Sequence, residues 1–260
     1  MNTVRHASLW LDLRLDGDTI VLAGATGRAG GATLHTLVGR GAFVILVSRS
    51  RLRAEELIAT LPDSEAQRRC HVIEADLADA AAGERVATSA IAWRGRVDAV
   101  VSLAGGGSAF VAIADSSFDD LQTSIRNNLD VTYNLFVPLL RRIVKQPARE
   151  NARSRCRFVA VTAGSSLTPQ PRFGIMGAGK AGVNLLMRAI AREHKADGVV
   201  ANAVILGTVA TEPARDYLDE AEFDAAASPQ EVADLLAFHA SDASSCVNGE
   251  LIHLNAREVD

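Results

Sequence analysis

The chain has few aromatic residues, few cysteines and no excess of positive charge. Aromatic residues make up 5% of the 260 positions although hydrophobic residues reach 48%, so the core must be built mainly from Ala, Val, Leu and Ile. Such a composition suits a parallel sheet that is buried on both faces. The net charge of −4, without a basic stripe, argues against nucleic acid and anionic membranes as partners.

The three cysteines, Cys70, Cys156 and Cys246, are scattered and show no metal-ligand spacing. We interpret them as reduced structural thiols and expect no metal site. The sequence also lacks an apolar run of about 18 residues, the length that a membrane-spanning helix needs, and its start shows no signal-peptide pattern. These absences predict a cytoplasmic protein without a membrane segment.

From residue 19 onward, short β-branched runs alternate with Ala-rich helical stretches, and the length fits one large α/β domain. Strands that alternate with helices predict βαβ units, and hence a doubly wound, mainly parallel sheet with helices on both faces. The seven expected strands are Thr19–Ala23, Phe43–Val47, His71–Ala75, Ala99–Leu103, Arg157–Thr162, Val199–Leu206 and Leu251–Leu254. The expected helices lie at about 28–40, 52–60, 79–93, 118–146, 174–195 and 229–241.

Residues 1–18 form an extension ahead of the predicted domain, which covers residues 19–260. Leu9, Leu11, Leu13 and Leu15 alternate with other side chains, and this period of two indicates a short strand. Two interpretations stay open. The extension is either a flap that packs on the body of the domain, or a lid or contact with a neighbouring subunit.

A glycine-rich segment follows the first expected strand and precedes the first expected helix. It reads Ala23-Gly24-Ala25-Thr26-Gly27-Arg28-Ala29-Gly30-Gly31, which has the spacing G-x-x-G-x-x-G. Small residues let the backbone approach a pyrophosphate, and a helix N-terminus offers free N–H groups and a positive dipole end. We therefore predict a dinucleotide-binding loop formed by Gly24, Thr26, Gly27, Arg28, Ala29 and Gly30; the alternative is a tight turn without a ligand.

The second expected strand ends at Ser48-Arg49-Ser50, without the acidic residue that often holds the ribose 2′-hydroxyl of NAD. A guanidinium can instead pair with a 2′-phosphate, and Arg28 could assist from the glycine loop. The segment Ser48–Ser50 therefore favours NADP(H) over NAD(H). The alternative for Arg49 is a solvated surface residue.

In order and spacing, these features resemble the short-chain dehydrogenase/reductase family, which has a Rossmann-type fold, from about residue 13 to 255. Further matching segments are Ala75-Asp76-Leu77, Ser102-Leu103-Ala104-Gly105, Asn128-Leu129, Ala201–Thr211 and Val247–Leu254. The resemblance implies that Asp76 and Leu77 hold the adenine ring, and that Val209 and Thr211 lie at the nicotinamide and its phosphate. It also implies cofactor contacts for Ala104, Gly105, Gly106, Lys180 and Gly207.

The chain departs from that family at the active site, where the usual motif is Tyr-x-x-x-Lys. Lys180 matches the lysine, but Met176 stands at the tyrosine position. The segment Phe173–Lys180 is similar to the enoyl-acyl-carrier-protein reductase branch, which uses Tyr-x6-Lys, yet Phe173 replaces that tyrosine. The family serine falls near Ala163 or Gly164, and the chain's two tyrosines, Tyr133 and Tyr217, do not fit either motif.

Without that phenol a reductase needs another proton source, because a positioned general acid contributes about 10²–10⁴-fold, or roughly 3–5 kcal/mol. Four candidates stay open. Ser165 or Ser166 could donate or relay a proton, and Lys180 with Asn128 could order a water. Tyr217 could approach from residues 212–227, which resemble the family's mobile substrate lid, or the substrate could carry its own acidic hydroxyl.

We expect a small-molecule reductase of the ketoreductase type that uses NADP(H) on an activated ketone, quinone or enone, with Lys180, Asn128, Ser165 and Ser166 as catalytic candidates. The alternatives are a non-catalytic NAD(P)-binding sensor or regulator, and a non-redox enzyme that uses the same pocket. The resemblance also implies a homodimer or homotetramer with contacts through the helices that begin near Asn128 and Phe173.

Overall fold

A computed structural model describes residues 13–150, 152–216 and 218–254. Its centre is one sheet of seven parallel strands in the order β3-β2-β1-β4-β5-β6-β7. The strands are β1 (Thr19–Ala23), β2 (Phe43–Ser48), β3 (Cys70–Glu74), β4 (Ala99–Ser102), β5 (Cys156–Ala163), β6 (Val199–Leu206) and β7 (Leu251–Leu254). The predicted doubly wound fold is confirmed, and each expected strand is found within one residue of its predicted ends.

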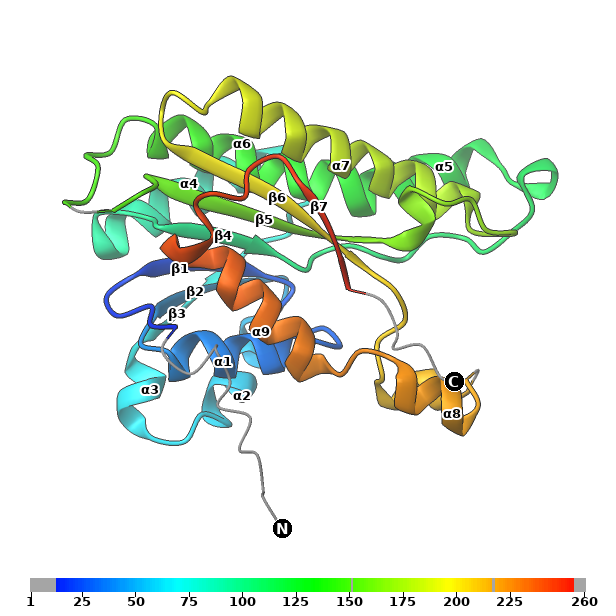
Figure 1. Cartoon of the computed structure of the whole chain (residues 1–260), viewed down its shortest axis with the longest axis horizontal. Coiled ribbons are helices and arrows are strands. Elements are labelled where there is room, and N and C mark those ends of the chain that lie inside the picture. The colour runs from blue at the N-terminus through cyan, green and yellow to red at the C-terminus, as the bar shows by residue number, and fades with distance from the viewer. Residues whose placement is uncertain (1–12, 151, 217, 255–260) are drawn as a thin grey trace, which may run out of the picture.

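Two helical layers cover the sheet (Figure 1). The helices are α1 (Gly30–Gly39), α2 (Arg51–Ala59), α3 (Ser64–Arg68), α4 (Ala80–Arg94), α5 (Phe118–Ile125), α6 (Val131–Ile143), α7 (Gly174–Glu193), α8 (Glu220–Ala225) and α9 (Pro229–Ala240). In Figure 1, α4, α6 and α7 lie on one face, and α1 and α9 on the other. Both layers bury the sheet, so all residues of the central strands β1 and β4 are buried, as continuous apolar strands require.

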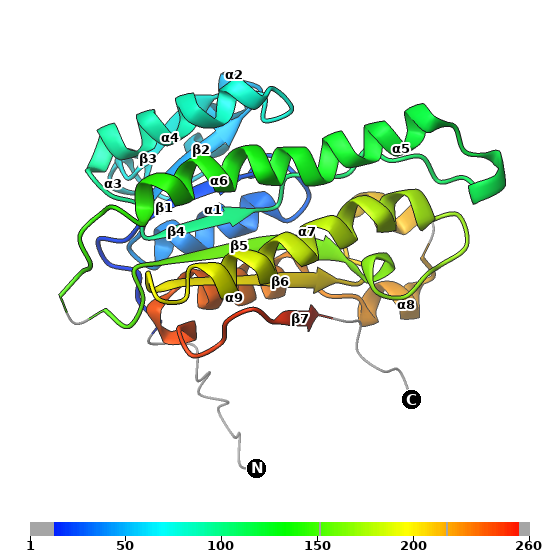
Figure 2. The ribbon, with the colours of Figure 1, turned by 90° about the horizontal axis from the view of Figure 1, so that it is seen from above.

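The chain order places a switch point between two central strands. From β1 the chain moves outward through β2 and β3, and then returns to β4 on the other side of β1. In open α/β sheets, ligands bind outside the carboxyl ends of the strands at such a point. The arrowheads of β5, β6 and β7 in Figure 2 point to the end of the molecule where α8 lies, which is the carboxyl edge of the sheet.

The single long helix expected at 118–146 is wrong in detail, because a π-helical turn at Arg126–Asp130 separates α5 from α6. Within this turn the Asn128 side chain donates to the carbonyl of Ser124 at 2.9 Å. Such turns occur as local bulges in helices and are frequent at functional sites. The short helices α3 and α8 were not predicted, because five and six residues are too few to show a helical period.

Of the extension, the structure describes Leu13–Asp18, which packs against the domain. Leu15 is buried, and its N–H donates to the carbonyl of Arg40 at 2.8 Å. Leu13 and Leu15 are not in a strand, and the expected alternation at Leu9 and Leu11 lies outside the described residues. Within the described ranges no helix is long and apolar enough to cross a membrane.

Buried ion pairs hold together the amino ends of β1, β4 and β5. Arg157 donates to Asp18 at 2.9 Å and lies 3.5 Å from Asp242, which precedes β7. Asp98 pairs with Arg96 at 2.7 Å and accepts the N–H of Thr19 at 2.9 Å. Burial raises the pKa of Asp18, against the opposing effect of Arg157. This edge of the sheet therefore places its buried charges in pairs.

Candidate active site

The glycine loop is pressed tightly between β1, β4 and α1. Gly24 has φ +83°, and a Cβ added there would lie 2.7 Å from the backbone nitrogen of Ala104. A Cβ at Gly30 would lie 2.3 Å from the carbonyl oxygens of Gly24 and Ala25. Only glycine fits at these two positions. The loop thereby brings the first turn of α1 to the carboxyl ends of β1 and β4.

The remaining residues of the predicted loop face solvent or start the helix. Thr26, Gly27 and Arg28 are exposed. Ala29 precedes α1, and its methyl side chain cannot cap the helix. The first-turn N–H groups of α1 thus lack a side-chain acceptor from Ala29, which suits an anionic group of a ligand.

The end of β2 is held in a tight local arrangement around an exposed arginine. The Ser48 hydroxyl accepts the N–H of Ser50 at 3.2 Å, and the Ser50 hydroxyl caps α2 by accepting the N–H of Arg53 at 3.3 Å. Arg49 is exposed between the two serines. The predicted Ser48–Ser50 segment is therefore a loop held by hydrogen bonds of its two serines, with the Arg49 side chain exposed between them.

Sequence reasoning missed one acidic residue near this loop. Glu74, the last residue of β3, pairs in register with Ser48, and its carboxylate accepts the N–H of Arg51 at 3.2 Å. The end of the second strand carries no acidic residue of its own. The end of the third strand carried the missing signal, because adjacent parallel strands end at the same edge.

The residues implied to hold adenine follow β3. Asp76 is exposed, and its carboxylate accepts the N–H of Ala78 at 3.0 Å. Leu77 is buried, and its carbonyl accepts the side-chain N–H of Asn134 at 2.8 Å. The turn is thus fixed from α6, with an apolar residue and an exposed carboxylate side by side.

Lys180 and Asn128 meet at the loop after β4. A Cβ added at Gly105, which has φ +146°, would lie 2.6 Å from Lys180 Nζ and 2.9 Å from Asn128 Oδ1. Asn128 Oδ1 also accepts the N–H of Gly106 at 3.0 Å. The π turn and α7 therefore bring both predicted catalytic residues to Gly105, which lies far from them in sequence.

The Lys180 ammonium is buried and donates to the carbonyl of Val161 at 3.1 Å. Burial lowers the pKa of Lys180 to about 8. An ammonium has three donors, and Val161 is its one acceptor within the part of the chain that the structure describes. The remaining N–H groups are available to a ligand.

Three buried hydroxyl groups lie at the carboxyl ends of three adjacent strands or in the segments after them. Ser102 ends β4, Ser165 follows β5 and Thr211 follows β6. The side-chain oxygen of each is buried without a hydrogen-bond partner among the described residues. Buried polar atoms are normally paired, so unpaired ones need an explanation such as an absent ligand or water. Their shared position at the carboxyl edge indicates a ligand site there.

The structure separates the two predicted serines. Ser166 donates to the carbonyl of Ala163 at 2.6 Å and accepts from Asn184 at 2.8 Å, while Asn184 accepts from Thr162 at 2.9 Å. The Ser166 hydroxyl is therefore occupied in holding the turn after β5 against α7. Sequence reasoning missed Asn184, whose position four residues after Lys180 on one helix was the available signal.

The positions of the missing tyrosine lie along the start of α7. Met176 stands about one turn before Lys180 and is partly buried, while Phe173 directly precedes the helix and packs edge-on against Phe110 at 5.0 Å between ring centres. Tyr133 is exposed on α6, and Tyr217 lies outside the described residues. The segment after β6 is anchored at Gly207, which donates to Leu254, and at Val209, which pairs with Ala227.

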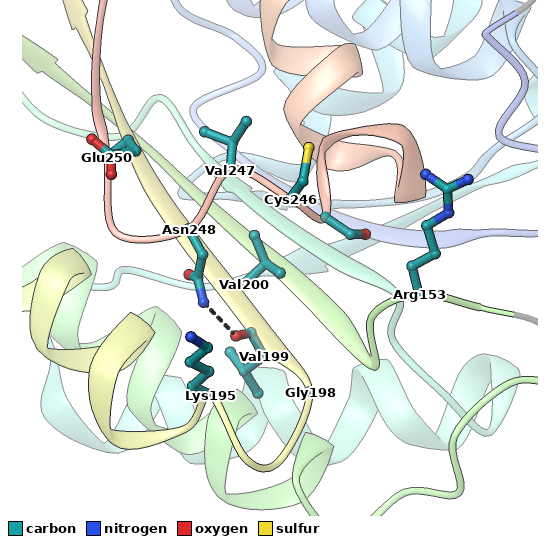
Figure 3. A pocket seen from close by; sticks show the side chains of 10 residues that line it. Arg153, Lys195, Gly198, Val199, Val200, Cys246, Val247, Asn248 and Glu250 are labelled. Carbon is teal, nitrogen blue, oxygen red and sulfur yellow. Dashed lines mark hydrogen bonds between the residues drawn. The ribbon is translucent and has the colours of Figure 1, made fainter.

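A hollow of about 550 Å³ lies at the opposite, amino edge of the sheet (Figure 3). Its lining includes Lys195, Gly198, Cys246, Asn248 and Glu250, and no predicted site residue contributes to it. Ligands of open α/β sheets bind at the other edge, so we do not assign the active site to this hollow. In the described ranges, no group of three or more His, Cys, Asp or Glu residues could hold a metal.

Comparisons with known proteins agree with this geometry. The family model described as short chain dehydrogenase matches residues 18–222. The 3-oxoacyl-acyl-carrier-protein reductase FabG of Salmonella typhimurium is 28% identical over 94% of this chain and 98% of that protein. A Mycobacterium tuberculosis protein named (5R,7aS)-5-hydroxy-7a-methyl-1-oxo-2,3,5,6,7,7a-hexahydro-1H-indene-carboxyl-CoA reductase is 30% identical over 94% of each chain.

The fold is also found in a gluconate 5-dehydrogenase from Burkholderia cenocepacia solved with NADP and tartrate. That structure superposes with a TM-score of 0.81 at 22% identity, over 94% of this chain and 95% of the other. The chain therefore belongs to the short-chain dehydrogenase family and is an NAD(P)-binding oxidoreductase.

Proposed function

We propose that the protein is an NADP(H)-dependent reductase of an activated ketone, quinone or enone, with a proton source other than tyrosine. The observation that carries the proposal is the set of hydroxyls of Ser102, Ser165 and Thr211, which have no partner among the described residues and lie at the same edge of the sheet as the buried Lys180. A glycine loop and an uncapped helix end at the same edge supply what a pyrophosphate requires.

The described residues fit the dinucleotide. The glycine loop and α1 would hold the pyrophosphate, Asp76 and Leu77 the adenine, and Arg49 with Arg28 a 2′-phosphate. The segment Gly207–Thr211 and Lys180 would hold the nicotinamide end together with residues 104–106. The neighbour solved with NADP supports this preference, whereas the Glu74 carboxylate opposes it in part.

The preference is tested by titrating the protein with NADPH and NADH. We expect tighter binding of NADPH, and Ser48→Asp should reverse the order, because a carboxylate there repels a 2′-phosphate and accepts from a 2′-hydroxyl. Equal affinity of the parent protein for both would contradict the preference. Absence of binding at millimolar concentration would overturn the reductase proposal.

The bound nicotinamide supplies the hydride, so the chain's own residues must orient the substrate and move one proton. Met176 and Phe173 have no acidic proton to give. Ser165 is the first candidate for a relay, because its hydroxyl is buried and unpaired within the described chain. In a second alternative, Lys180 and Asn128 would order a water beside Gly105 that gives the proton. In a third, the proton comes from a hydroxyl on the substrate. Tyr217, which lies outside the described residues, stays a candidate.

The substrate class is proposed from the site and from the names of relatives. The two relatives reported above are named as reductases of a 3-oxoacyl group and of an indene-carboxyl-CoA, both larger than simple alcohols. A carbonyl that is already activated suits a site without a phenol, since hydride transfer then depends less on a strong general acid. A screen of quinones, enones and aromatic ketones with NADPH tests this point.

A non-catalytic NAD(P)-binding sensor is the second candidate function, and the thioether of Met176 at the usual proton-donor position favours it. A sensor would bind the dinucleotide without turnover on any carbonyl in the screen. A non-redox enzyme in the same pocket would instead transform a substrate without consuming NADPH. Product analysis with and without NADPH therefore separates the three functions.

We also propose a cytoplasmic homodimer or homotetramer in which residues 1–18 form an accessory segment of the domain 19–260. Large apolar side chains are exposed on the α5–α7 layer at Phe118, Tyr133 and Leu185. Exposed apolar groups on neighbouring helices are typical of subunit contacts. A monomer in light scattering at micromolar concentration would contradict this assembly.

A further inference from the structure

Exposed apolar side chains gather beside the site, on the loops that follow β4 and β5. Phe110 is 49% exposed, Ile113 64% and Leu167 42%. Single exposed apolar residues are ordinary, but a group at one edge usually marks a binding surface. Phe110 and Ile113 belong to the segment between β4 and α5, and Leu167 belongs to the segment between β5 and α7; we call these three residues the apolar lip.

The lip is fixed to α7 by specific contacts. Phe110 packs edge-on against Phe173, and its carbonyl accepts from Arg172 at 3.1 Å. Arg172 has φ +68°, a left-handed conformation that is uncommon for residues other than glycine. A Cβ added at Gly174 would lie 2.7 Å from the Cδ1 atom of Ile113. Residues at the start of α7 therefore contact two members of the lip, Phe110 and Ile113.

Two apolar residues stand between the lip and the buried ammonium along the start of α7. Phe173, Met176 and Lys180 are spaced by three and then four positions, which places them on one side of α7. Seven residues of α-helix span about 10 Å. A molecule that reaches from Lys180 to Phe110 must be of this length and must tolerate apolar surroundings along it. A small polyol would lose hydrogen bonds to water there without regaining them from these side chains.

From this arrangement we infer that the substrate is an extended, flat, apolar carbonyl compound whose ring system lies on Phe110, Ile113 and Leu167, with its carbonyl at the Lys180 end. The inference rests on the proposed reductase function and assigns specificity to the lip. The lip is continuous with Phe173 and Met176, which replace polar groups inside the site, and that continuity favours a substrate over a second subunit as the occupant.

Two vicinal dicarbonyl compounds provide the test, and because reduction of the quinone also forms an aromatic ring, the decisive readout is the effect of the variants on each substrate. Phenanthrenequinone carries a fused aromatic body, and diacetyl carries two methyl groups. With NADPH we expect kcat/KM for phenanthrenequinone to exceed that for diacetyl by at least ~100-fold, in keeping with the apolar area that becomes buried. Phe110→Ala and Ile113→Ala should each reduce kcat/KM for phenanthrenequinone ~10-fold or more, mainly through KM.

The same variants should leave diacetyl turnover and NADPH affinity unchanged. Leu52→Ala is the matched control, because Leu52 is also an exposed apolar residue but lies on α2. Equal kcat/KM for the two diketones, or variants that lower both alike, would overturn the inference and leave the reductase proposal intact. Loss of oligomer in the Phe110 and Ile113 variants, with kinetics unchanged, would assign the lip to a second subunit instead.

Binding of phenanthrene, which has no carbonyl to reduce, separates this inference from the proposed function. Fluorescence titration of the NADPH complex should show binding that weakens in Phe110→Ala and persists in Leu52→Ala. If phenanthrene binds in this way and neither diketone is reduced, the lip is supported and the reductase proposal fails. If phenanthrene does not bind, the inference fails.

Discussion

The two edges of the sheet treat their buried polar groups differently. At the amino edge, Arg157 and Asp98 are buried and ion-paired, and the Arg157–Asp18 pair joins segments that are distant in sequence. At the carboxyl edge, Lys180 has one acceptor and the hydroxyls of Ser102 and Ser165 have none within the described residues. The amino edge is satisfied by the chain itself, whereas the carboxyl edge leaves donors for something else.

The contrast between the two edges holds for the buried charged groups and not for every buried polar atom. Thr19 at the amino edge also has an unpaired hydroxyl among the described residues, and the unpaired ring nitrogen of His239 lies on α9. Charges decide the comparison, because a buried charge without partners is far more destabilising than a buried hydroxyl. Among the described residues, the buried ammonium of Lys180 has a single acceptor. It lies at the carboxyl edge of the sheet, where the candidate active site is.

The largest effect is expected at the amino edge. Arg157→Met removes the buried arginine that pairs with Asp18 and leaves this carboxylate only the partly exposed Arg149 as a partner, so we expect the free energy of unfolding to fall by about 3 kcal/mol. Chemical denaturation measures this, with Arg141→Met as control, since Arg141 forms an exposed pair with Glu84 and should change stability by less than about 0.5 kcal/mol. A loss below about 1 kcal/mol at Arg157 would break the comparison.

The opposite sign is expected for Lys180→Met without cofactor. The pKa of Lys180 is about 8 in the folded protein and 10.5 in the reference state, so the charged form destabilises the fold. Near neutral pH we expect the variant to be more stable by on the order of 2–3 kcal/mol and to bind NADPH more weakly.

The pH dependence sharpens this prediction. Between pH 8 and 10.5 the unfolded chain binds more protons at this lysine than the folded protein does, so the stability of the parent protein rises with pH there. The advantage of the variant should therefore shrink across that window. Denaturation near both ends measures it, with the exposed Lys195→Met as control. A destabilised variant at neutral pH would show that the ammonium is better paired than the geometry indicates.

The two serines after β5 should differ in kind. Ser165→Ala removes an unpaired hydroxyl, so stability should hold while kcat falls ~10²-fold if Ser165 relays the proton. Ser166→Ala breaks the bonds to Ala163 and Asn184, so stability should fall by about 1 kcal/mol. If turnover persists in Ser165→Ala, the proton source is instead the substrate's own hydroxyl or an ordered water.

The smallest effect is expected from restoring the phenol. Met176→Tyr and Phe173→Tyr place a hydroxyl at the two family positions, yet we expect little gain in kcat/KM on a good substrate, because another donor already serves. Steady-state kinetics with NADPH measure the change. A gain above ~10-fold would show that the native site lacks a competent proton donor, and would favour the sensor function.

Much of the fold was readable from the sequence, and the failures have local causes. Buried parallel strands such as Ala99–Ser102 are continuous apolar runs, so their ends could be predicted closely. The π turn around Asn128 could not, because it arises from a side-chain bond to Ser124 within an unbroken helical pattern. The role of Asn184 could not be predicted for a similar reason, since it depends on hydrogen bonds to Ser166 and Thr162 from another segment.

The sequence by itself determined the parallel α/β fold, the glycine loop at its first turn and the loss of tyrosine before Lys180. Each of these is a short-range pattern, because strand burial, turn chemistry and helix spacing are local properties. Only the tertiary structure decided that Lys180 meets Asn128 at Gly105, that the Ser166 hydroxyl is paired while the Ser165 hydroxyl has no partner in the described part of the chain, and that Glu74 lies level with Ser48. Those relations depend on which strands are neighbours, and neighbours are set by packing of the whole chain.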